Sequence, residues 1–266
     1  MTGGGRAGTW RANARLVGLL LLAVTAVQCA SPTAAPSAPA ATSAPPATAD
    51  PASASAWQPT VVLVRQEHGA WTFQCGGVAI GPSAVLTAAH CIEDTKGDPI
   101  GVAPRAGEAP LAATRVDVHP RRRAEANPQA FDLAVVHVSA AARLPSAPIE
   151  SVADGSLPRT VTFDGSGDAE RELWTRRARL VVPRQCFVQA AGTYDTASML
   201  CVGGEQDGDL TLRVCPGDSG GPVWTGEGSS RRVVGVISFG RGCDGEQVAV
   251  AARVGLTDHW VEDQSH

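Results

Sequence analysis

The sequence predicts an all-β protein built from two antiparallel six-stranded β-barrels, with a short helix near the C-terminus. Short runs rich in β-branched residues recur along the chain, separated by turns that contain Gly, Pro, Asn or Asp. The runs fall into two sets of about six, which favours two barrels over one sandwich. A helical pattern of apolar residues is found only over residues 256–262.

The expected strands begin at Thr60, where Ala and Pro give way to Val and Leu. The first set covers residues 61–64, 71–80, 84–87, 114–118 and 133–138. The second set covers residues 160–163, 178–182, 222–224, 233–239 and 247–254.

Composition limits the compartment and the partners. A chain of 266 residues can bury a large core. Its formal net charge of −4 provides no basic footprint, so we expect no nucleic-acid partner and no polybasic membrane contact. Seven cysteines favour an oxidising compartment.

Residues 1–30 are expected to form an export signal. Arg6, Arg11 and Arg15 precede an apolar run over residues 16–27, which is short for a transmembrane helix. Small residues ending at Ala26 predict cleavage there and a secreted, extracellular protein.

Cys29 leaves an alternative open. A bacterial lipoprotein is cleaved before such a cysteine and lipidated on it, which would anchor the protein at the outer face of the cell membrane. Gln28 is an unusual residue at the position before that cysteine. Residues 31–57 consist largely of Ala, Pro, Ser and Thr, and we expect a flexible linker there.

A glycine-rich segment around one serine is the strongest chemical signal: Cys215-Pro216-Gly217-Asp218-Ser219-Gly220-Gly221-Pro222. Glycines let the backbone turn sharply, so the N–H groups of Gly217 and Ser219 can point at one spot, as an oxyanion hole requires. A serine hydroxyl needs a base to act as a nucleophile. His90, after the apolar run that ends at Thr87, is the candidate base, and Asp132, at the start of an apolar strand, is the candidate third member.

The order His90, Asp132, Ser219 resembles that of trypsin/chymotrypsin-type serine proteases. The matching segments are Thr87-Ala88-Ala89-His90-Cys91, Asp132-Leu133-Ala134 and Gly217-Asp218-Ser219-Gly220-Gly221-Pro222. The resemblance implies a chymotrypsin-like protease domain over residues 58–266, with its site in the cleft between the two barrels. It implies a serine endopeptidase, of the bacterial secreted kind, that acts on polypeptides.

The same resemblance assigns the roles. Ser219 would attack the carbonyl, His90 would transfer the proton, and Asp132 would orient and stabilise the imidazolium. The N–H groups of Gly217 and Ser219 would bind the oxyanion. No cofactor or metal is expected; protein protease inhibitors are possible partners, and the protein should be a monomer.

The resemblance also selects a disulfide pairing. Leaving Cys29 aside, six cysteines allow 15 connectivities. The family pattern implies Cys75–Cys91, Cys186–Cys201 and Cys215–Cys243. A zinc site is the competing interpretation, and the absence of a CxxC pair from the sequence disfavours it.

Specificity is expected to depend on the segment Ser238-Phe239-Gly240 and on residue 213. By resemblance the segment would pair with the substrate backbone, Ser238 would support Asp132, and Ala249 would lie on the S1 wall. Arg213 occupies the position that forms the floor of the family's S1 pocket. A guanidinium there needs a carboxylate, so one hypothesis is a preference for Asp or Glu at P1. The alternative is that Arg213 turns outward or pairs with a nearby acid.

Activation is a point of departure from the family. Family zymogens are cut before an Ile/Val-Val-Gly-Gly segment, whose new amino group pairs with the acid before the nucleophile. That acid would be Asp218, yet no such segment lies between residues 31 and 75. Either Asp218 has another cationic partner or the Ser219 loop is held differently. A catalytically silent binding or scaffold relative and an esterase using the same site remain alternatives.

Arg121-Arg122-Arg123 precedes Asp132 by about ten residues. We expect these arginines to form an exposed loop. A processing or autolysis site is the other interpretation.

Overall fold

The structure is a computed structural model. It describes residues 58–150, 157–166, 173–189, 193–205, 212–240, 243, 248–255 and 259–266. The predicted export signal (1–30), including Cys29, and the predicted linker (31–57) lie outside the described residues. The described residues all belong to one compact unit.

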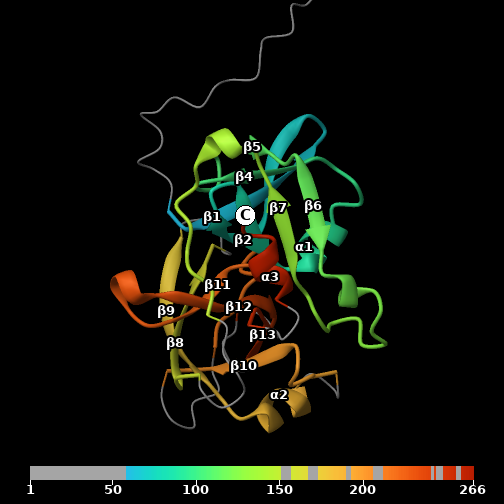
Figure 1. The fold of residues 1–266 in the computed structure, drawn as a ribbon. Helices are drawn as coiled ribbons and strands as arrows, with labels where there is room; N and C mark the ends of the chain where they lie inside the picture. The colour runs from blue at the N-terminus through green and yellow to red at the C-terminus, as the bar shows by residue number, and fades with distance from the viewer. Residues whose placement is uncertain are drawn as a thin grey trace, which may run out of the picture. The chain divides into compact units, whose positions relative to one another are not determined.

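The first seven strands form one antiparallel sheet in the order β5-β4-β1-β2-β3-β7-β6 (Figure 1). Its two edge strands, β5 and β6, are separated by only Ala113 and Thr114. The Ala113 N–H donates to the Ile100 carbonyl at 2.8 Å, and the Thr114 N–H donates to the His137 carbonyl at 2.7 Å. Ala113 thus bonds to β4, near one end of the sheet, and the next residue bonds to β7, near the other end. The sheet must therefore curl into an almost closed half-barrel. The strands are β1 (Thr60–Glu67), β2 (Ala70–Gly81), β3 (Ala84–Thr87), β4 (Ile100–Ala103), β5 (Leu111–Ala112), β6 (Arg115–Val118) and β7 (Ala134–His137).

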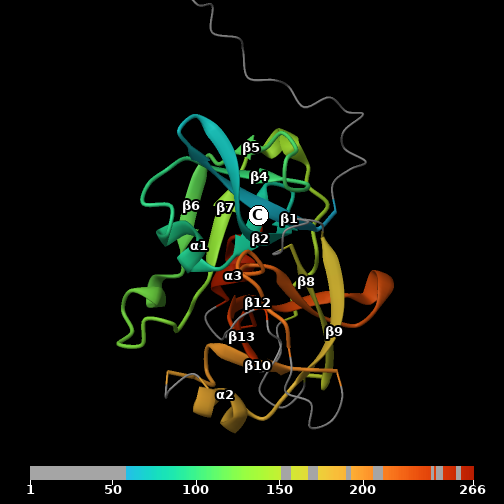
Figure 2. The same cartoon turned by 180° about the vertical axis from the view of Figure 1, so that it is seen from behind.

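The remaining six strands form a closed antiparallel barrel in the order β10-β13-β12-β11-β8-β9. Pairing of β10 with β9, where Val202 faces Leu180, closes it. The strands are β8 (Thr160–Gly165), β9 (Trp174–Leu180), β10 (Met199–Gly203), β11 (Pro222–Thr225), β12 (Arg232–Phe239) and β13 (Ala249–Arg253). Figures 1 and 2 show the sheet and the barrel as two halves, with α2 (Pro183–Gln189) at the end of the barrel far from the sheet.

The predicted all-β class with two barrel-like parts is confirmed, with one difference in detail. The N-terminal part is an open, curled sheet of seven strands and not a closed six-stranded barrel. The additional strands β4 and β5 are short and rich in Ala and Gly, so they carry little β-propensity of their own. Pairing with β1 holds β4 in the sheet.

The helices are short. Besides α2, the described residues form α1 (Ala89–Glu93), α3 (Trp260–Asp263) and the 3₁₀ turns η2 (Pro120–Arg122), η3 (Ala140–Ala142) and η4 (Gly228–Ser230). The predicted C-terminal helix is present as α3, although residues 256–258 lie outside the described residues. Within the described ranges, each helix falls short of the length and apolar character needed to cross a membrane.

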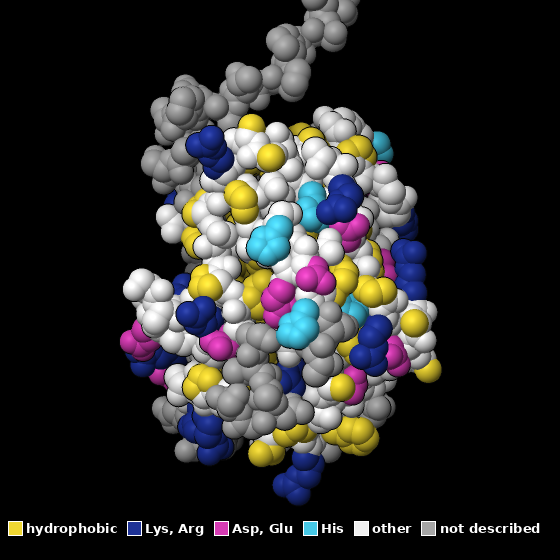
Figure 3. Space-filling view, viewed as in Figure 1, with side chains coloured by type: hydrophobic (Ala, Val, Ile, Leu, Met, Phe, Trp, Pro, Cys, Tyr) yellow, Lys and Arg dark blue, Asp and Glu magenta, His cyan; other side chains and the backbone are white. Residues whose placement is uncertain are grey.

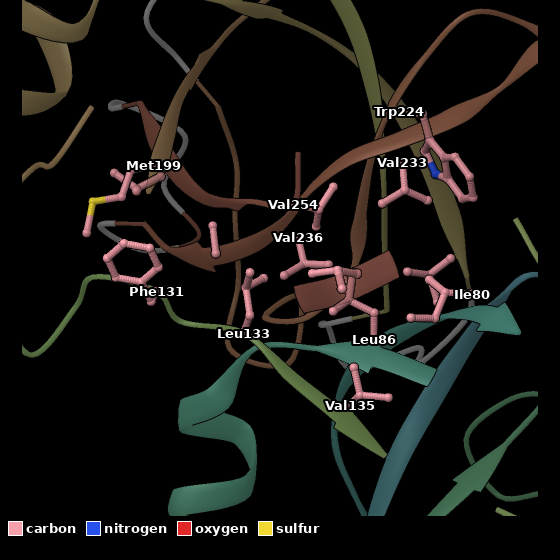
Figure 4. Close-up of a cluster of buried hydrophobic side chains, with 14 of the residues drawn as sticks. Ile80, Leu86, Phe131, Leu133, Val135, Met199, Trp224, Val233, Val236 and Val254 are labelled. Carbon is pink, nitrogen blue, oxygen red and sulfur yellow. The ribbon is translucent and has the colours of Figure 1, made fainter. Parts of the chain in front are cut away.

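The main hydrophobic cluster lies between the two halves. Figure 4 shows Leu86, Leu133 and Val135 from the sheet half facing Val236 and Val254 from the barrel half. All five side chains are fully buried. Burial of this shared cluster holds the two halves together at the place where the segments around His90, Asp132 and Ser219 meet.

A buried carboxylate, Asp164 on β8, forms a second connection between the halves. It accepts hydrogen bonds from Thr60 Oγ1 at 2.6 Å, Thr175 Oγ1 at 2.6 Å and Trp224 Nε1 at 2.9 Å. Arg231 adds an ion pair at 3.0 Å. Because Thr60 begins β1, this network ties the start of the sheet to the barrel.

Replacing Thr60 with Val tests this connection. The variant keeps the side-chain shape but removes one donor to the buried Asp164 carboxylate. We expect the free energy of unfolding, measured in urea, to fall by about 1.5–3 kcal/mol. Thr72→Val is the matched control, since Thr72 Oγ1 is only part-buried and lies 3.2 Å from both of its acceptors, the Arg65 carbonyl and Glu67 Oε2. A Thr60 variant as stable as the Thr72 variant would contradict the proposed connection.

Candidate active site

His90 lies on α1, directly after β3. The chain leaves β3 at Thr87 and passes through Ala88, which has extended backbone, before α1 begins. A disulfide between Cys75 on β2 and Cys91 on α1 holds this helix against the sheet. His90 is therefore held between strand β3 on one side and the Cys75–Cys91 disulfide on the other.

Asp132 is positioned by a backbone turn at Phe131. Phe131 has a φ of +51°, a left-handed conformation that costs a non-glycine residue about 1–2 kcal/mol. Its buried ring stacks on His119 at 5.0 Å, and the Arg121 guanidinium lies 3.9 Å from the ring centre. These contacts stabilise a conformation that otherwise would be unfavourable, and they direct Asp132 toward His90.

The Asp132 carboxylate accepts hydrogen bonds from three groups. His90 Nδ1 lies 2.7 Å from Oδ2, and the His90 backbone N–H donates to Oδ1 at 2.9 Å. Ser238 Oγ donates to Oδ2 at 2.5 Å. The carboxylate is only 3% exposed, so these donors replace the water that burial removes.

The pKa values of this pair move in opposite directions. Burial disfavours the His90 imidazolium, but the hydrogen bond and the negative charge of Asp132, together with Asp94, outweigh it and raise the pKa of His90. Burial also disfavours the Asp132 carboxylate. The hydrogen bonds and charge from His90, with Ser238 and Arg122, outweigh this and lower the pKa of Asp132. The lowered pKa of Asp132 favours its ionised form.

The Ser219 loop is clamped between the two halves by its backbone. The Gly76 N–H on β2 donates to the Ser219 carbonyl at 2.8 Å, and the Gly220 N–H donates to the Ile237 carbonyl on β12 at 2.7 Å. A Cβ on Gly220 would lie 2.2 Å from Thr87 Oγ1, and its φ is +80°. Only glycine fits at this position, which explains part of the glycine-rich motif.

The Ser219 hydroxyl lies beside the residue that also contacts Asp132. Ser219 Oγ donates to the Ser238 carbonyl at 3.4 Å, while Ser238 Oγ donates to Asp132. Ser238 therefore contacts both side chains from one strand, β12. Gly217, the other expected oxyanion-hole residue, has a φ of +101°, which again favours glycine.

Asp218 is fully buried, and backbone amides hold its carboxylate. Oδ2 accepts from the Cys215 N–H at 2.7 Å and Oδ1 accepts from the Ser166 N–H at 3.0 Å. A Cβ on Gly165 would lie 2.5 Å from Oδ1, so the end of β8 fits closely around this group. The acid before Ser219 thus has partners within the barrel half.

Gly240 and Ala249, two residues expected at the specificity pocket, lie close together. A Cβ on Gly240 would lie 3.1 Å from Val214 Cβ and 3.8 Å from Ala249 Cβ. Phe239 is half-buried beside them. Arg213, next to Val214, is exposed.

The structure contains the three disulfides that the resemblance implies: Cys75–Cys91, Cys186–Cys201 and Cys215–Cys243. Cys75, His90 and Cys91 also form a group of ligand-type atoms within 4.8 Å of one another. The two sulfurs share a disulfide, however, and a disulfide cannot supply the thiolates that hold zinc.

Comparisons with known proteins agree with this geometry. The family model described as Trypsin matches residues 48–261. The chain is 32% identical over 199 residues to a trypsin of Saccharopolyspora erythraea, covering 68% of this chain and 82% of that protein. It is 27% identical over 237 residues to serine protease 28 of Mus musculus, covering 77% of this chain and 82% of that protein.

The chain belongs to the trypsin family of serine proteases. Family membership implies polypeptide substrates. It also accounts for the chymotrypsin-like fold and for the order of His90, Asp132 and Ser219 along the chain.

Two residues near the site were not found by sequence reasoning. Phe131 sits in a left-handed turn, and no turn-forming residue such as Gly or Asn marks it. Arg122 was expected in an exposed loop, but its side chain is only 10% exposed and faces Asp132. For Arg121 and Arg123 the expectation of an exposed loop is met.

Replacing Asp218 with Asn tests the anchoring of the Ser219 loop. The substitution keeps the shape but places an NH₂ group against one of the two backbone N–H donors. We expect labelling of Ser219 by a fluorophosphonate to slow by roughly 10–100-fold, the equivalent of one lost hydrogen bond to a charged group. Asp98→Asn, at an exposed loop position, is the control. Equal labelling rates in the two variants, both folded by circular dichroism, would show that Asp218 does not hold the loop.

Proposed function

We propose that this protein is a serine endopeptidase that hydrolyses peptide bonds through an acyl-enzyme. The observation that carries the proposal is the contact of His90 Nδ1 with the buried Asp132 Oδ2 at 2.7 Å, with Ser238 linking that pair to Ser219. A neutral imidazole fixed in this way presents its Nε2 lone pair as a general base, because Nδ1 keeps its proton to donate to Asp132.

The proposed reaction has two halves. Ser219 Oγ attacks the scissile carbonyl while its proton passes to His90 Nε2; the C–N bond then breaks as that proton moves to the leaving amine. In the second half, water takes the place of the amine. His90 accepts a proton from the water as its oxygen attacks the ester carbonyl, and returns it to Ser219 Oγ as the ester bond breaks. Asp132 stays ionised throughout and stabilises the imidazolium.

The Ser219 hydroxyl has to change its hydrogen bond for the first step. In the structure it donates to the Ser238 carbonyl at 3.4 Å, a long contact that is cheap to exchange. Rotation about χ1 moves Oγ between staggered positions, and catalytic hydrogen bonds commonly tighten only when substrate is bound. The backbone N–H groups of Gly217 and Ser219 are proposed as the oxyanion donors.

For the P1 residue we propose a preference for Asp or Glu. Support comes from Arg213, an exposed residue that directly precedes Val214 in the chain, and Val214 lies close to Gly240, which also lies close to Ala249. A guanidinium offers a planar fork of N–H donors that matches a carboxylate, so Arg213 could bind an acidic P1 side chain at the rim. In the alternative, Arg213 turns outward or pairs with a nearby acid, and the apolar walls alone select the P1 side chain.

We propose that the signal at residues 1–30 exports the protein and that it acts outside the cell. The protein is either secreted or anchored through Cys29 at the outer face of the cell membrane. Three disulfides in the described part of the chain support an oxidising compartment. Figure 3 shows charged side chains of both signs scattered over one face of the molecule, without a broad basic surface there. Intact mass of the mature protein separates the two routes, since a diacylglycerol increment on Cys29 means anchoring.

The catalytic proposal is tested by treating the protein with a fluorophosphonate probe and measuring its intact mass. We expect one adduct in the unmodified protein and none in Ser219→Ala, with hydrolysis of a denatured polypeptide lost in that variant by at least about 10³-fold. Folded protein without an adduct would point to the catalytically silent alternative. An adduct with ester hydrolysis but no peptide hydrolysis would point to the esterase.

The P1 proposal is tested with a set of peptides that differ only at P1. We expect the highest kcat/KM for Glu or Asp, and a loss of about tenfold for these peptides alone in Arg213→Gln, the usual worth of a charge-assisted hydrogen bond. Arg105→Gln, at an exposed position between β4 and β5, is the matched control. Best cleavage after Lys or Arg, unchanged in Arg213→Gln, would rule out the acidic preference.

A further inference from the structure

Arg122 is the inward-facing member of the arginine triplet. Arg121 and Arg123 are exposed, whereas the Arg122 side chain is only 10% exposed. The triplet overlaps η2 (Pro120–Arg122), in which the Arg122 N–H donates to the His119 carbonyl at 2.9 Å. A protease needs an extended segment to cut, so this turn favours a structural or chemical role for Arg122 over a processing site.

The Arg122 guanidinium reaches two carboxylates on different elements. Its NH2 group lies 3.0 Å from Glu93 Oε2 on α1, the helix that carries His90, and donates to it. The same group lies 3.5 Å from Asp132 Oδ1. Arg122 therefore bridges η2, the end of α1 and the segment before β7 with one planar, permanently charged group.

The bridge meets a specific electrostatic need. The Asp132 carboxylate is 3% exposed, and its uncharged partners, a neutral imidazole, a backbone N–H and the Ser238 hydroxyl, bring no net positive charge. A buried carboxylate without a cation is costly. Arg122 supplies a permanent positive charge, whereas His90 supplies one only when it is protonated.

The charged groups around His90 oppose one another. Asp132, before β7, and Asp94, at the end of α1, raise the pKa of His90. Arg122, from η2, lowers it, and the same charge lowers the pKa of Asp132. Glu93 faces Arg122 from α1 and partly neutralises it. The arrangement thus stabilises ionised Asp132 without the full rise in the pKa of His90 that a buried carboxylate alone would cause.

We propose that Arg122 is a positioning residue of the triad, which holds the Asp132 carboxylate and the His90 helix in place and keeps His90 available as a neutral base. The inference rests on the proposed function, because the triad matters only if Ser219 is the nucleophile. Arg122 touches neither substrate nor reacting atoms and acts through Asp132 and His90.

The test compares Arg122→Met, which removes the charge but keeps most of the length, with Arg123→Met as the matched control. The readout is kcat/KM of the full chain as a function of pH, on the best peptide of the P1 set. His90 must be neutral to act, so activity rises as the pH passes its pKa. Without Arg122 that pKa rises, so the acid limb should move to higher pH. The ratio of Arg122→Met to unmodified kcat/KM should therefore be lower at pH 6 than at pH 8, whereas the Arg123→Met ratio should be the same at both.

Two further variants keep the test decisive if Arg122→Met folds poorly. Arg122→Lys retains the charge, so its acid limb should stay near that of the unmodified protein even if kcat falls. Glu93→Gln retains an acceptor for Arg122 but removes the neutralising charge, so its acid limb should move to lower pH, opposite to Arg122→Met. A profile of Arg122→Met that superimposes on the unmodified one, with only a loss of stability in urea, would overturn the proposal in favour of a purely structural role.

Failure of the proposed function is separated by a measurement that needs no turnover. The titration of His90, followed by NMR of its ring C–H signals, reports the same charge balance in an inactive protein. If neither the unmodified protein nor Arg123→Met reacts with the probe, the endopeptidase proposal fails. A higher His90 titration midpoint in Arg122→Met would then still support the bridge, and an unchanged midpoint would refute it.

Discussion

The buried charge of Asp132 is the constraint on which the arrangement of this molecule depends. Removing a carboxylate from water is strongly unfavourable unless donors replace the lost hydration. Three elements supply replacements: α1 through His90, β12 through Ser238 and η2 through Arg122. A fourth, the strained turn at Phe131, aims the carboxylate at them. A helix, a strand, a turn and a loop must therefore all be in place before Asp132 is satisfied, so the site can form only when both halves of the domain have folded together.

The Ser219 loop follows a different principle, because backbone contacts hold it and leave no room for side chains. Gly76 approaches Gly221 so closely that a Cβ on it would lie 2.9 Å from the Gly221 nitrogen, and the Gly76 N–H donates to the Ser219 carbonyl. The hydrophobic cluster between the halves provides the energy of association, but it is non-directional. The direct backbone contact provides the register, which sets the position of Ser219 relative to His90 on the adjacent α1.

Sequence reasoning succeeded where a residue type strongly favours one local structure. The β-branched runs predicted most strands, because Val and Ile pack well on a pleated surface, and the glycines of the serine motif reflect positive φ and close approach at Gly220. It failed where pairing with a neighbouring strand, and not the local sequence, determines that a segment is a strand. β4 (Ile-Gly-Val-Ala) is a strand because β1 pairs with it, and β10 because β9 and β13 lie on its two sides. The helix α2 had a local signal, Pro183 at its first position, that was overlooked.

The arginine triplet shows the same limit for the site. Arg121, Arg122 and Arg123 have one composition but three environments: over the Phe131 ring, between two carboxylates, and in solvent. Only the 3₁₀ turn at Pro120 determines which of them points inward, and a local sequence pattern does not encode the position of Asp132 ten residues later.

The two buried acids of the site, Asp132 and Asp218, are stabilised in ways that suit different tasks. The contacts of Asp218 include the backbone N–H groups of Cys215 and Ser166, dipoles that do not titrate and cannot rotate away. Asp132 is surrounded by groups whose charge changes or balances, since His90 can take up a proton and Arg122 is shared with Glu93. A fixed network suits a residue that only shapes the loop, whereas an adjustable charge balance suits one beside a proton-transfer base. Because the fixed network lies within the barrel half, the shape of the Ser219 loop has a source of stability that is separate from the pH-sensitive pair.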